Sequence, residues 1–145
     1  MSVGRICIRK IDVVEPQESV QVAARRMHDR KVGALVVVNK SHEPVGIVTD
    51  RDLTVRVLAE GHDAVQTPVA EVMTRPARTV TEATPIEEVV RIMRRGAFRR
   101  LPVVDESGKL LGLVTLDDIL SLLTEELRDV GGVLAEETPR NLART

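Results

Sequence analysis

The residues best suited to chemistry are a threonine and an aspartate that occur twice at one spacing. Thr49 and Asp52 follow the apolar run 46–48, and Thr115 and Asp118 follow the run 112–114. Each pair is expected where a strand ends and a helix begins, and the free N–H groups there favour a phosphate. The hydroxyl could donate to a phosphate oxygen, and the carboxylate could accept from ribose hydroxyls. The alternative is that both residues only cap helices, but two in-register copies favour a ligand site.

The two pairs belong to an internal repeat with an offset of 66 residues. Without a gap, Met27 aligns with Met93, 35–38 with 101–104, and Ser41 with Ser107, which is the pattern of a duplicated structural unit. Each half is short for a separate hydrophobic core, so we expect the halves to share one. The duplication predicts pseudo-twofold symmetry and two related sites.

Each half is predicted to form a strand, a helix, two hairpin strands and a second helix. The fold class is therefore α/β (α+β), with two β-α-β-β-α repeats and small mixed sheets flanked by helices. Ser19 and Thr84 are the expected N-caps of the first helix in each half. Gly96 is the expected end of the helix that Thr84 caps. The expected domains are a first repeat at 5–62, a connector at 63–70, a second repeat at 71–130 and a tail at 131–145. Gly131-Gly132 and Thr138-Pro139 predict that this tail is loosely ordered.

Composition narrows the class of protein. The chain has 145 residues, a net charge of -1, and no Trp or Tyr, so it lacks the basic and aromatic surface expected for binding nucleic acid. No apolar run is long enough for a membrane span, and the single Cys7 fits a reduced compartment, so a cytoplasmic location is expected. The three histidines lack metal-ligand spacing, and no catalytic or phosphate-loop motif is found. We therefore expect neither a metal site nor an enzyme.

These segments together resemble a tandem pair of CBS domains, named after cystathionine beta-synthase. The resemblance covers about residues 5–128 and rests on 71–74, on 101–105, on 112–118, and on the first-half partners ending at 49–52. It implies two repeats whose sheets pack back to back, with a cleft between them that commonly binds adenosine nucleotides. The Thr-x-x-Asp motif would contact phosphate and ribose, and the segment before the first hairpin strand would line the base.

The resemblance implies two sets of site residues. Those of the first site are Gly33, Ala34, Leu35, Thr49 and Asp52, with Arg51 added inside the motif. Those of the second site are Arg99, Arg100, Leu101, Pro102, Thr115 and Asp118. Asp117 would repel phosphate in the second site, whereas Arg51 would attract it in the first. Phe98 is expected in the core rather than against the base.

The resemblance also implies a role. Most of the chain is the pair itself, so we expect a stand-alone regulatory module that binds AMP, ADP or ATP, requires no cofactor and signals to an unknown protein partner. The alternative is an interaction or assembly protein with vacant sites or a non-nucleotide ligand. A homodimer is expected because several helices carry wide apolar stripes, namely Val20, Ala23, Ala24 and Met27, then Ile86, Val89, Val90 and Met93, and finally Ile119, Leu120 and Leu123.

Overall fold

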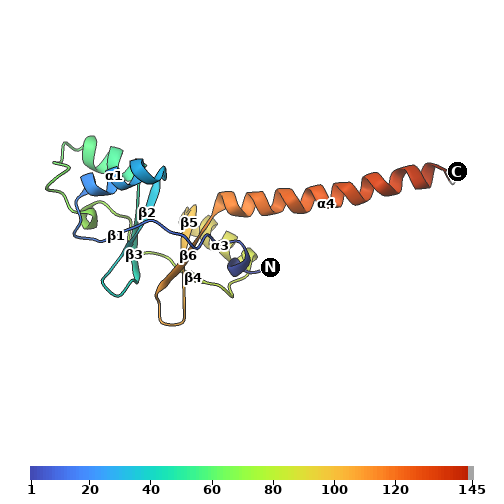
Figure 1. Ribbon diagram of the computed structural model, residues 1–145, viewed down its shortest axis with the longest axis horizontal. Coiled ribbons are helices and arrows are strands. Elements are labelled where there is room, and N and C mark those ends of the chain that lie inside the picture. The colour runs from blue at the N-terminus through green and yellow to red at the C-terminus, as the bar shows by residue number, and fades with distance from the viewer. Residues whose placement is uncertain (144–145) are drawn as a thin grey trace.

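Two three-stranded mixed sheets form the centre of the molecule (Figure 1). The computed structural model describes residues 1–143, with side chains through Glu136. The first sheet contains β1 (Val13–Val14), β2 (Ala34–Val38) and β3 (Pro44–Thr49); the second contains β4 (Val80–Thr81), β5 (Arg100–Val104) and β6 (Leu110–Thr115). In each sheet the short first strand is parallel to the central strand and the hairpin is antiparallel. The register shift in each hairpin also falls at equivalent positions, Val37/Val38 and Val103/Val104, so the mixed α/β repeat is confirmed.

Helices connect and flank these strands. They are α1 (Val20–Arg30), α2 (Asp50–Leu53) continued by a π-helical turn (Thr54–Leu58), α3 (Ile86–Gly96), α4 (Leu116–Ala143), and the 3-10 turns Val3–Arg5 and Val69–Glu71. Ser19 caps α1 as predicted, because its side chain accepts a hydrogen bond from the Val22 N–H. The predicted Thr84 cap is wrong: its hydroxyl accepts from the Thr81 N–H instead, and α3 starts after Pro85 without a side-chain cap.

The expectation of a loosely ordered tail from residue 131 is also wrong for the described part of that tail, residues 131–143. The chain does not leave the helix at Gly131-Gly132; α4 is continuous from Leu116 to Ala143. A glycine inside a helix costs about 1 kcal/mol relative to alanine, which weakens a helix but does not by itself end it. The helix projects away from both sheets (Figure 1).

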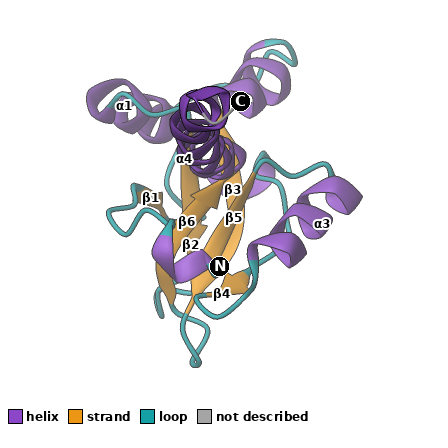
Figure 2. Cartoon of the chain, turned by 90° about the vertical axis from the view of Figure 1, so that its right-hand side faces the viewer, coloured by secondary structure: helices purple, strands orange, loops and turns teal. Residues whose placement is uncertain are grey.

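Three apolar clusters hold the layers together. Leu35 and Val37 pack with α1 in the first core, and Leu101 and Val103 pack with α3 in the second. Val36 and Val38 point the other way, against Leu110 of the second sheet. The sheets therefore lie against each other with α1 and α3 on opposite outer sides (Figure 2).

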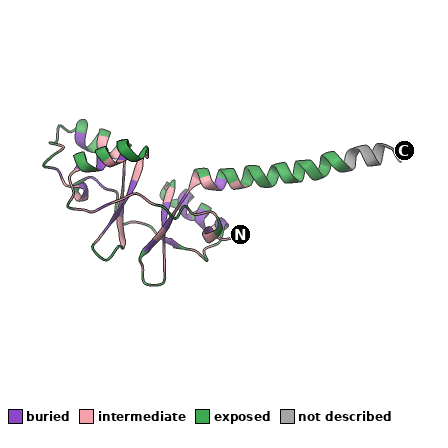
Figure 3. Ribbon diagram, in the orientation of Figure 1, coloured by how far each residue is buried: buried purple, intermediate pink, exposed green. Residues whose placement is uncertain are grey.

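The helical stripes expected to need a partner are mostly covered within the chain. Val20, Ala23 and Met27 of α1 are buried, as are Ile86, Val89 and Met93 of α3. These buried side chains are therefore not available for contact with a second copy. Among the described residues, exposed large apolar side chains are most numerous on α4. Figure 3 shows this helix exposed along its length beyond the body.

The two repeats exchange their leading segments. Val3 lies in the second core, whereas Val69, Val72 and Met73 lie in the first. Ile8 forms a backbone bridge with Leu113 of β6, and Thr74 forms the equivalent bridge with Ile47 of β3. Each core is consequently completed by chain from the neighbouring repeat.

Candidate functional site

Both Thr-x-x-Asp pairs form the same reciprocal cap. The Thr49 N–H donates to Asp52 Oδ2 at 2.9 Å, and the Asp52 N–H donates to Thr49 Oγ1 at 3.1 Å. Thr115 and Asp118 repeat the arrangement, with both distances 3.1 Å. The capping role is therefore present, and it fixes both side chains at the start of α2 and α4. Each threonine hydroxyl keeps its proton to donate, and each aspartate keeps a second oxygen to accept.

The first pair borders a cavity between the repeats. The cavity has a volume of about 360 Å³, within the range of about 300–1,000 Å³ that is usual for small-molecule sites. Three segments line it: 49–52 at the end of β3, 74–78 ahead of β4, and 96–101 between α3 and β5. Its wall thus combines the motif of the first repeat with two segments of the second.

The charge in this cavity is mostly positive. Arg51, Arg78, Arg99 and Arg100 line it, together with Asp50 and Asp52. Within residues 1–136, none of these four guanidinium groups forms a hydrogen bond or an ion pair. They are therefore free to meet an anion, and a guanidinium is well suited to bidentate contact with phosphate.

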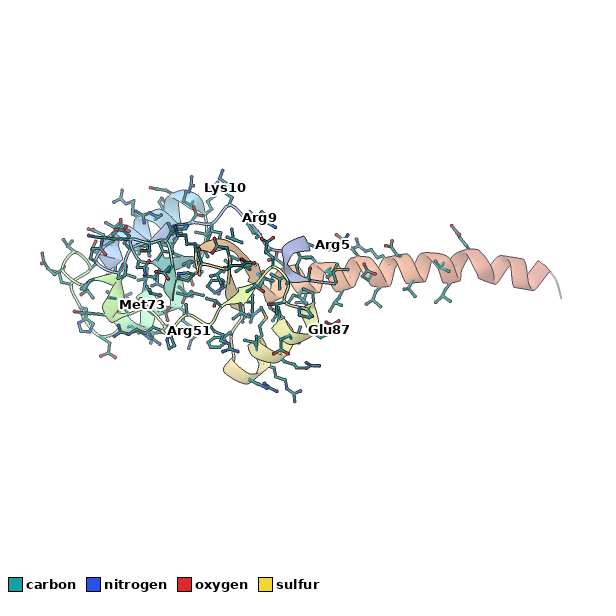
Figure 4. The ribbon with its side chains drawn as sticks, turned by 90° about the horizontal axis from the view of Figure 1, so that it is seen from below. Arg5, Arg9, Lys10, Arg51, Met73 and Glu87 are labelled. Carbon is teal, nitrogen blue, oxygen red and sulfur yellow. The ribbon has the colours of Figure 1, made fainter. Side chains whose placement is uncertain are left out.

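Glycine at position 46 lets segment 74–78 reach the cavity. A Cβ on Gly46 would lie 2.7 Å from Met73 Sδ and 2.9 Å from the Thr74 carbonyl oxygen. Real Cβ atoms do not approach this closely, so only glycine fits without displacing the segment. Arg51 and Met73 lie at one edge of the body, and Arg9 and Lys10 at the opposite edge (Figure 4). Segments 8–12 and 74–78 therefore flank opposite sides of the paired sheets, as the repeat symmetry requires.

Arg56 links the motif to the same segment. Its Nε lies 3.9 Å from Asp52 Oδ1, and its Nη1 donates to the Val72 carbonyl at 2.9 Å. The equivalent position in the second repeat is Leu122, so only the first aspartate has such a neighbour. The two otherwise similar motifs therefore differ in their charge environment.

A smaller cavity borders the second pair. It has a volume of about 310 Å³ and is lined by Arg99, Arg100, Thr115, Leu116 and Asp117. Arg99 and Arg100 thus border both cavities, although the resemblance assigned them to the second site alone. Asp117 brings a carboxylate to this cavity, and segment 8–12 does not line it.

The expected site residues are divided by the structure. Thr49, Arg51, Asp52, Arg99, Arg100 and Leu101 line the first cavity. Gly33, Ala34, Leu35, Pro102 and Asp118 line neither cavity. Leu35 is buried in the first core, and the Gly33 carbonyl accepts the Asp50 N–H at 2.9 Å. Leu35 and Gly33 therefore have structural roles next to the first motif.

Sequence reasoning missed several residues of the wall. They are Ile47, Asp50, Thr74, Pro76, Ala77, Arg78, Gly96, Ala97 and Phe98. Phe98 packs against the second core and also lines the cavity, so its assignment to the core alone was incomplete. The segment 74–78 could have been found from the repeat, because an offset of 66 residues aligns it with 8–12, directly ahead of the first strand.

Among the described residues, no three His, Cys, Asp or Glu side chains gather in a way that could hold a metal ion. None of the described helices combines the length and apolar character needed to cross a membrane.

A family model and related sequences both match this chain. A model described as "CBS domain" matches residues 3–59 and again 69–125. An uncharacterized protein of Methanopyrus kandleri is 37% identical over 122 residues, covering 84% of this chain and 62% of the relative. The CBS domain-containing protein YhcV of Bacillus subtilis is 36% identical over 110 residues, covering 76% of each. The chain therefore spans less than two thirds of the first of these relatives.

Solved structures share the architecture. The CBS domain pair of MJ0100, in complex with 5-methylthioadenosine and S-adenosyl-L-methionine, has a TM-score of 0.78 at 26% identity, covering 87% of this chain and 98% of that one. CBSX2 in complex with AMP has a TM-score of 0.73 at 29% identity, covering 86% and 96%. A hexameric CBS-CP12 protein from bloom-forming cyanobacteria has a TM-score of 0.74 at 30% identity, covering 83% and 69%. The duplicated motif, the paired mixed sheets and these matches lead to one conclusion: the chain belongs to the CBS domain family and carries two CBS domains in tandem.

Proposed function

We propose that the protein binds an adenosine nucleotide in the cavity bordered by Thr49 and Asp52. The observation that carries the proposal is the meeting of this motif with four unpaired arginines in one cavity between the repeats. Asp52 Oδ2 is used in the helix cap, which leaves Oδ1 to accept ribose hydroxyls. Phe98, which is half-buried at the cavity, would supply apolar surface for the base.

The charges favour a ligand with phosphate groups, such as AMP, ADP or ATP. Relatives of the same fold bind AMP in one case and S-adenosyl-L-methionine with 5-methylthioadenosine in another. Arg51, Arg78, Arg99 and Arg100 would be matched by phosphate oxygens, whereas a neutral thionucleoside would leave them unmatched. We therefore expect affinity to rise from adenosine to AMP to ATP.

The second cavity is the weaker candidate. Asp117 borders it, and its wall includes fewer segments of the chain than the first. A carboxylate close to a phosphate lowers affinity through like-charge repulsion. One nucleotide per chain at the first cavity is thus the expected stoichiometry at moderate ligand concentration.

The proposed role is regulatory rather than catalytic. The nucleotide would be sensed, and the occupied pair would signal to a protein partner, with the pair acting as a homodimer. The competing function is an assembly protein whose cavities take no nucleotide. Thermal unfolding separates the two, because a ligand that binds only the folded state must raise the melting temperature.

The test uses Asp52→Asn with Asp118→Asn as its matched control. Asparagine keeps an oxygen for the Thr49 N–H, so the cap survives while the charged acceptor for ribose is lost. A hydrogen bond to a charged group is worth about 1.5–3 kcal/mol, so calorimetry should show ATP binding weakened roughly 10- to 100-fold by Asp52→Asn. Asp118→Asn should leave it unchanged. Equal ATP binding by all three proteins would reject the assignment, and no binding by the wild type would favour the assembly function.

A further inference from the structure

The part of α4 beyond the body exposes an apolar face. Ile119 is buried in the second core, but from Leu123 to Glu136 every residue is exposed. Leu127 is 71% exposed and Val130 is 56% exposed. Figures 1 and 3 show this segment leaving the body as a single exposed rod.

The apolar residues of this face follow a heptad pattern. Leu120, Leu123, Leu127, Val130 and Leu134 are separated alternately by three and four residues. This spacing places them on one stripe, and it is the pattern by which helices pack along a coiled-coil seam. We call these five positions the α4 seam.

The helix itself requires packing of this kind. Most of the stability of a helix in a protein comes from packing of its apolar face, and two central glycines lower the intrinsic stability of α4. Among the described residues, a Cβ at Gly131 or Gly132 would meet no atom within 4 Å, so no close contact there explains either glycine. Burial of the α4 seam would provide the missing stabilisation.

We propose that the α4 seam pairs with the α4 seam of a second copy, in parallel and in register. A second copy offers the same heptad spacing over the same length, so in register leucine packs on leucine at four layers and Val130 packs on Val130 at the fifth. The inference is independent of nucleotide binding, because the seam lies outside both cavities.

Charge on the flanks of the seam favours the parallel orientation. The positions that flank the seam on either side, e and g of the heptad, are Thr124, Glu126, Gly131 and Val133 between residues 120 and 133. Glu126 is the only charged residue among these four. In a parallel pair Glu126 faces Gly131 of the other copy, so no like charges meet. In the fully overlapping antiparallel pair Glu126 would face Glu126, which costs free energy through repulsion.

The first test is the mass of the full chain without nucleotide, by light scattering at tens of micromolar. We expect twice the chain mass for the wild type. The control Ala135→Glu adds a negative charge on the side of α4 away from the seam and should also give twice the chain mass. Leu127→Glu, in the middle of the seam, should halve the mass. A wild-type mass of one chain, or an undiminished mass for Leu127→Glu, would overturn the proposal.

Folding and orientation are tested separately. Leu127 is exposed in the single chain, so Leu127→Glu should retain the circular dichroism of the body and a single cooperative unfolding transition. In a Cys7→Ser background, Leu127→Cys should form an intermolecular disulfide on mild oxidation, whereas Glu125→Cys on the outer side should not. Equal cross-linking of the two cysteine variants would overturn the parallel seam.

Discussion

At the scale of single residues, the first motif combines an observed helix cap with a proposed ligand contact, two roles that are often treated as alternatives. Asp52 completes a helix cap with Oδ2, its Oδ1 lies 3.9 Å from Arg56 Nε, and the residue also lines the cavity. The cap orders the carboxylate before any ligand arrives, which lowers the entropic cost of binding. In the proposed site, the structural role of Asp52 would therefore support its role in ligand binding.

Arg51→Gln should weaken binding of ATP much more than binding of adenosine. A charge-assisted contact with phosphate is worth about 1.5–3 kcal/mol, so calorimetry should show a loss of roughly 10- to 100-fold for ATP. Arg91→Gln is the control, because Arg91 pairs with Glu88 on the exposed side of α3. Unchanged ATP affinity in Arg51→Gln would show that Arg51 does not contact the phosphates.

The pair of Glu18 and Arg26 should make stability depend on pH. The hydrogen bonds from Arg26 lower the pKa of Glu18, and burial opposes them only partly. Since the folded-state pKa lies below the unfolded value of about 4.3, the stabilisation is complete above that value and is lost as the pH falls through the folded pKa. The difference in unfolding free energy between wild type and Glu18→Gln should therefore shrink on acidification. Glu60→Gln, at a residue without an ion pair in the described part of the chain, should show no such trend.

At the scale of elements, β3 and the segment ahead of β4 must lie in close contact. Thr74 exchanges backbone hydrogen bonds with Ile47 at 2.8 and 3.1 Å, and this pairing holds the cavity wall in place. Arg56 adds a side-chain bond to the Val72 carbonyl from the helical turn after the motif. A change at this contact should affect the cavity even though no ligand-contacting group is altered.

Gly46→Ala should therefore lower both stability and nucleotide affinity. Overpacking of this kind costs about 1–3 kcal/mol, measurable by denaturant unfolding, and it should displace Thr74 from β3. Gly112→Ala is the matched variant, because its Cβ would lie 3.0 Å from the Ile8 carbonyl on the other side of the molecule. Gly112→Ala should lower stability while leaving ATP affinity at the first cavity unchanged. Equal loss of affinity in both variants would indicate a general effect of instability.

At the scale of the whole molecule, the exchanged segments make the two repeats one cooperative unit. Val3 is fully buried in the second core, and Val69 is fully buried in the first. Neither core is complete without chain from the other repeat. Unfolding one repeat would therefore expose apolar surface of both.

Val3→Ala and Val69→Ala should each lower the free energy of unfolding by about 2 kcal/mol, as expected for a truncated aliphatic core residue. Although the residues lie in different cores, each variant should still unfold in one transition, with far-UV dichroism and calorimetry giving the same midpoint. Two separate transitions in either variant would show that the repeats unfold independently.

The sequence by itself determined the repeat, the succession of strands and helices along the chain, and the strand-to-helix junction at each Thr-x-x-Asp pair, because apolar periodicity and cap chemistry are local properties of neighbouring residues. It could not determine that Arg99 and Arg100 border the cavity of Thr49, since that contact joins residues far apart in the chain and depends on how the sheets pack. It also misplaced the end of α4, because the cost of two glycines had to be weighed against the helix-forming residues around them. Only the tertiary structure decided which segments share a wall, because the exchanged segments bring one repeat's chain against the other repeat's sheet.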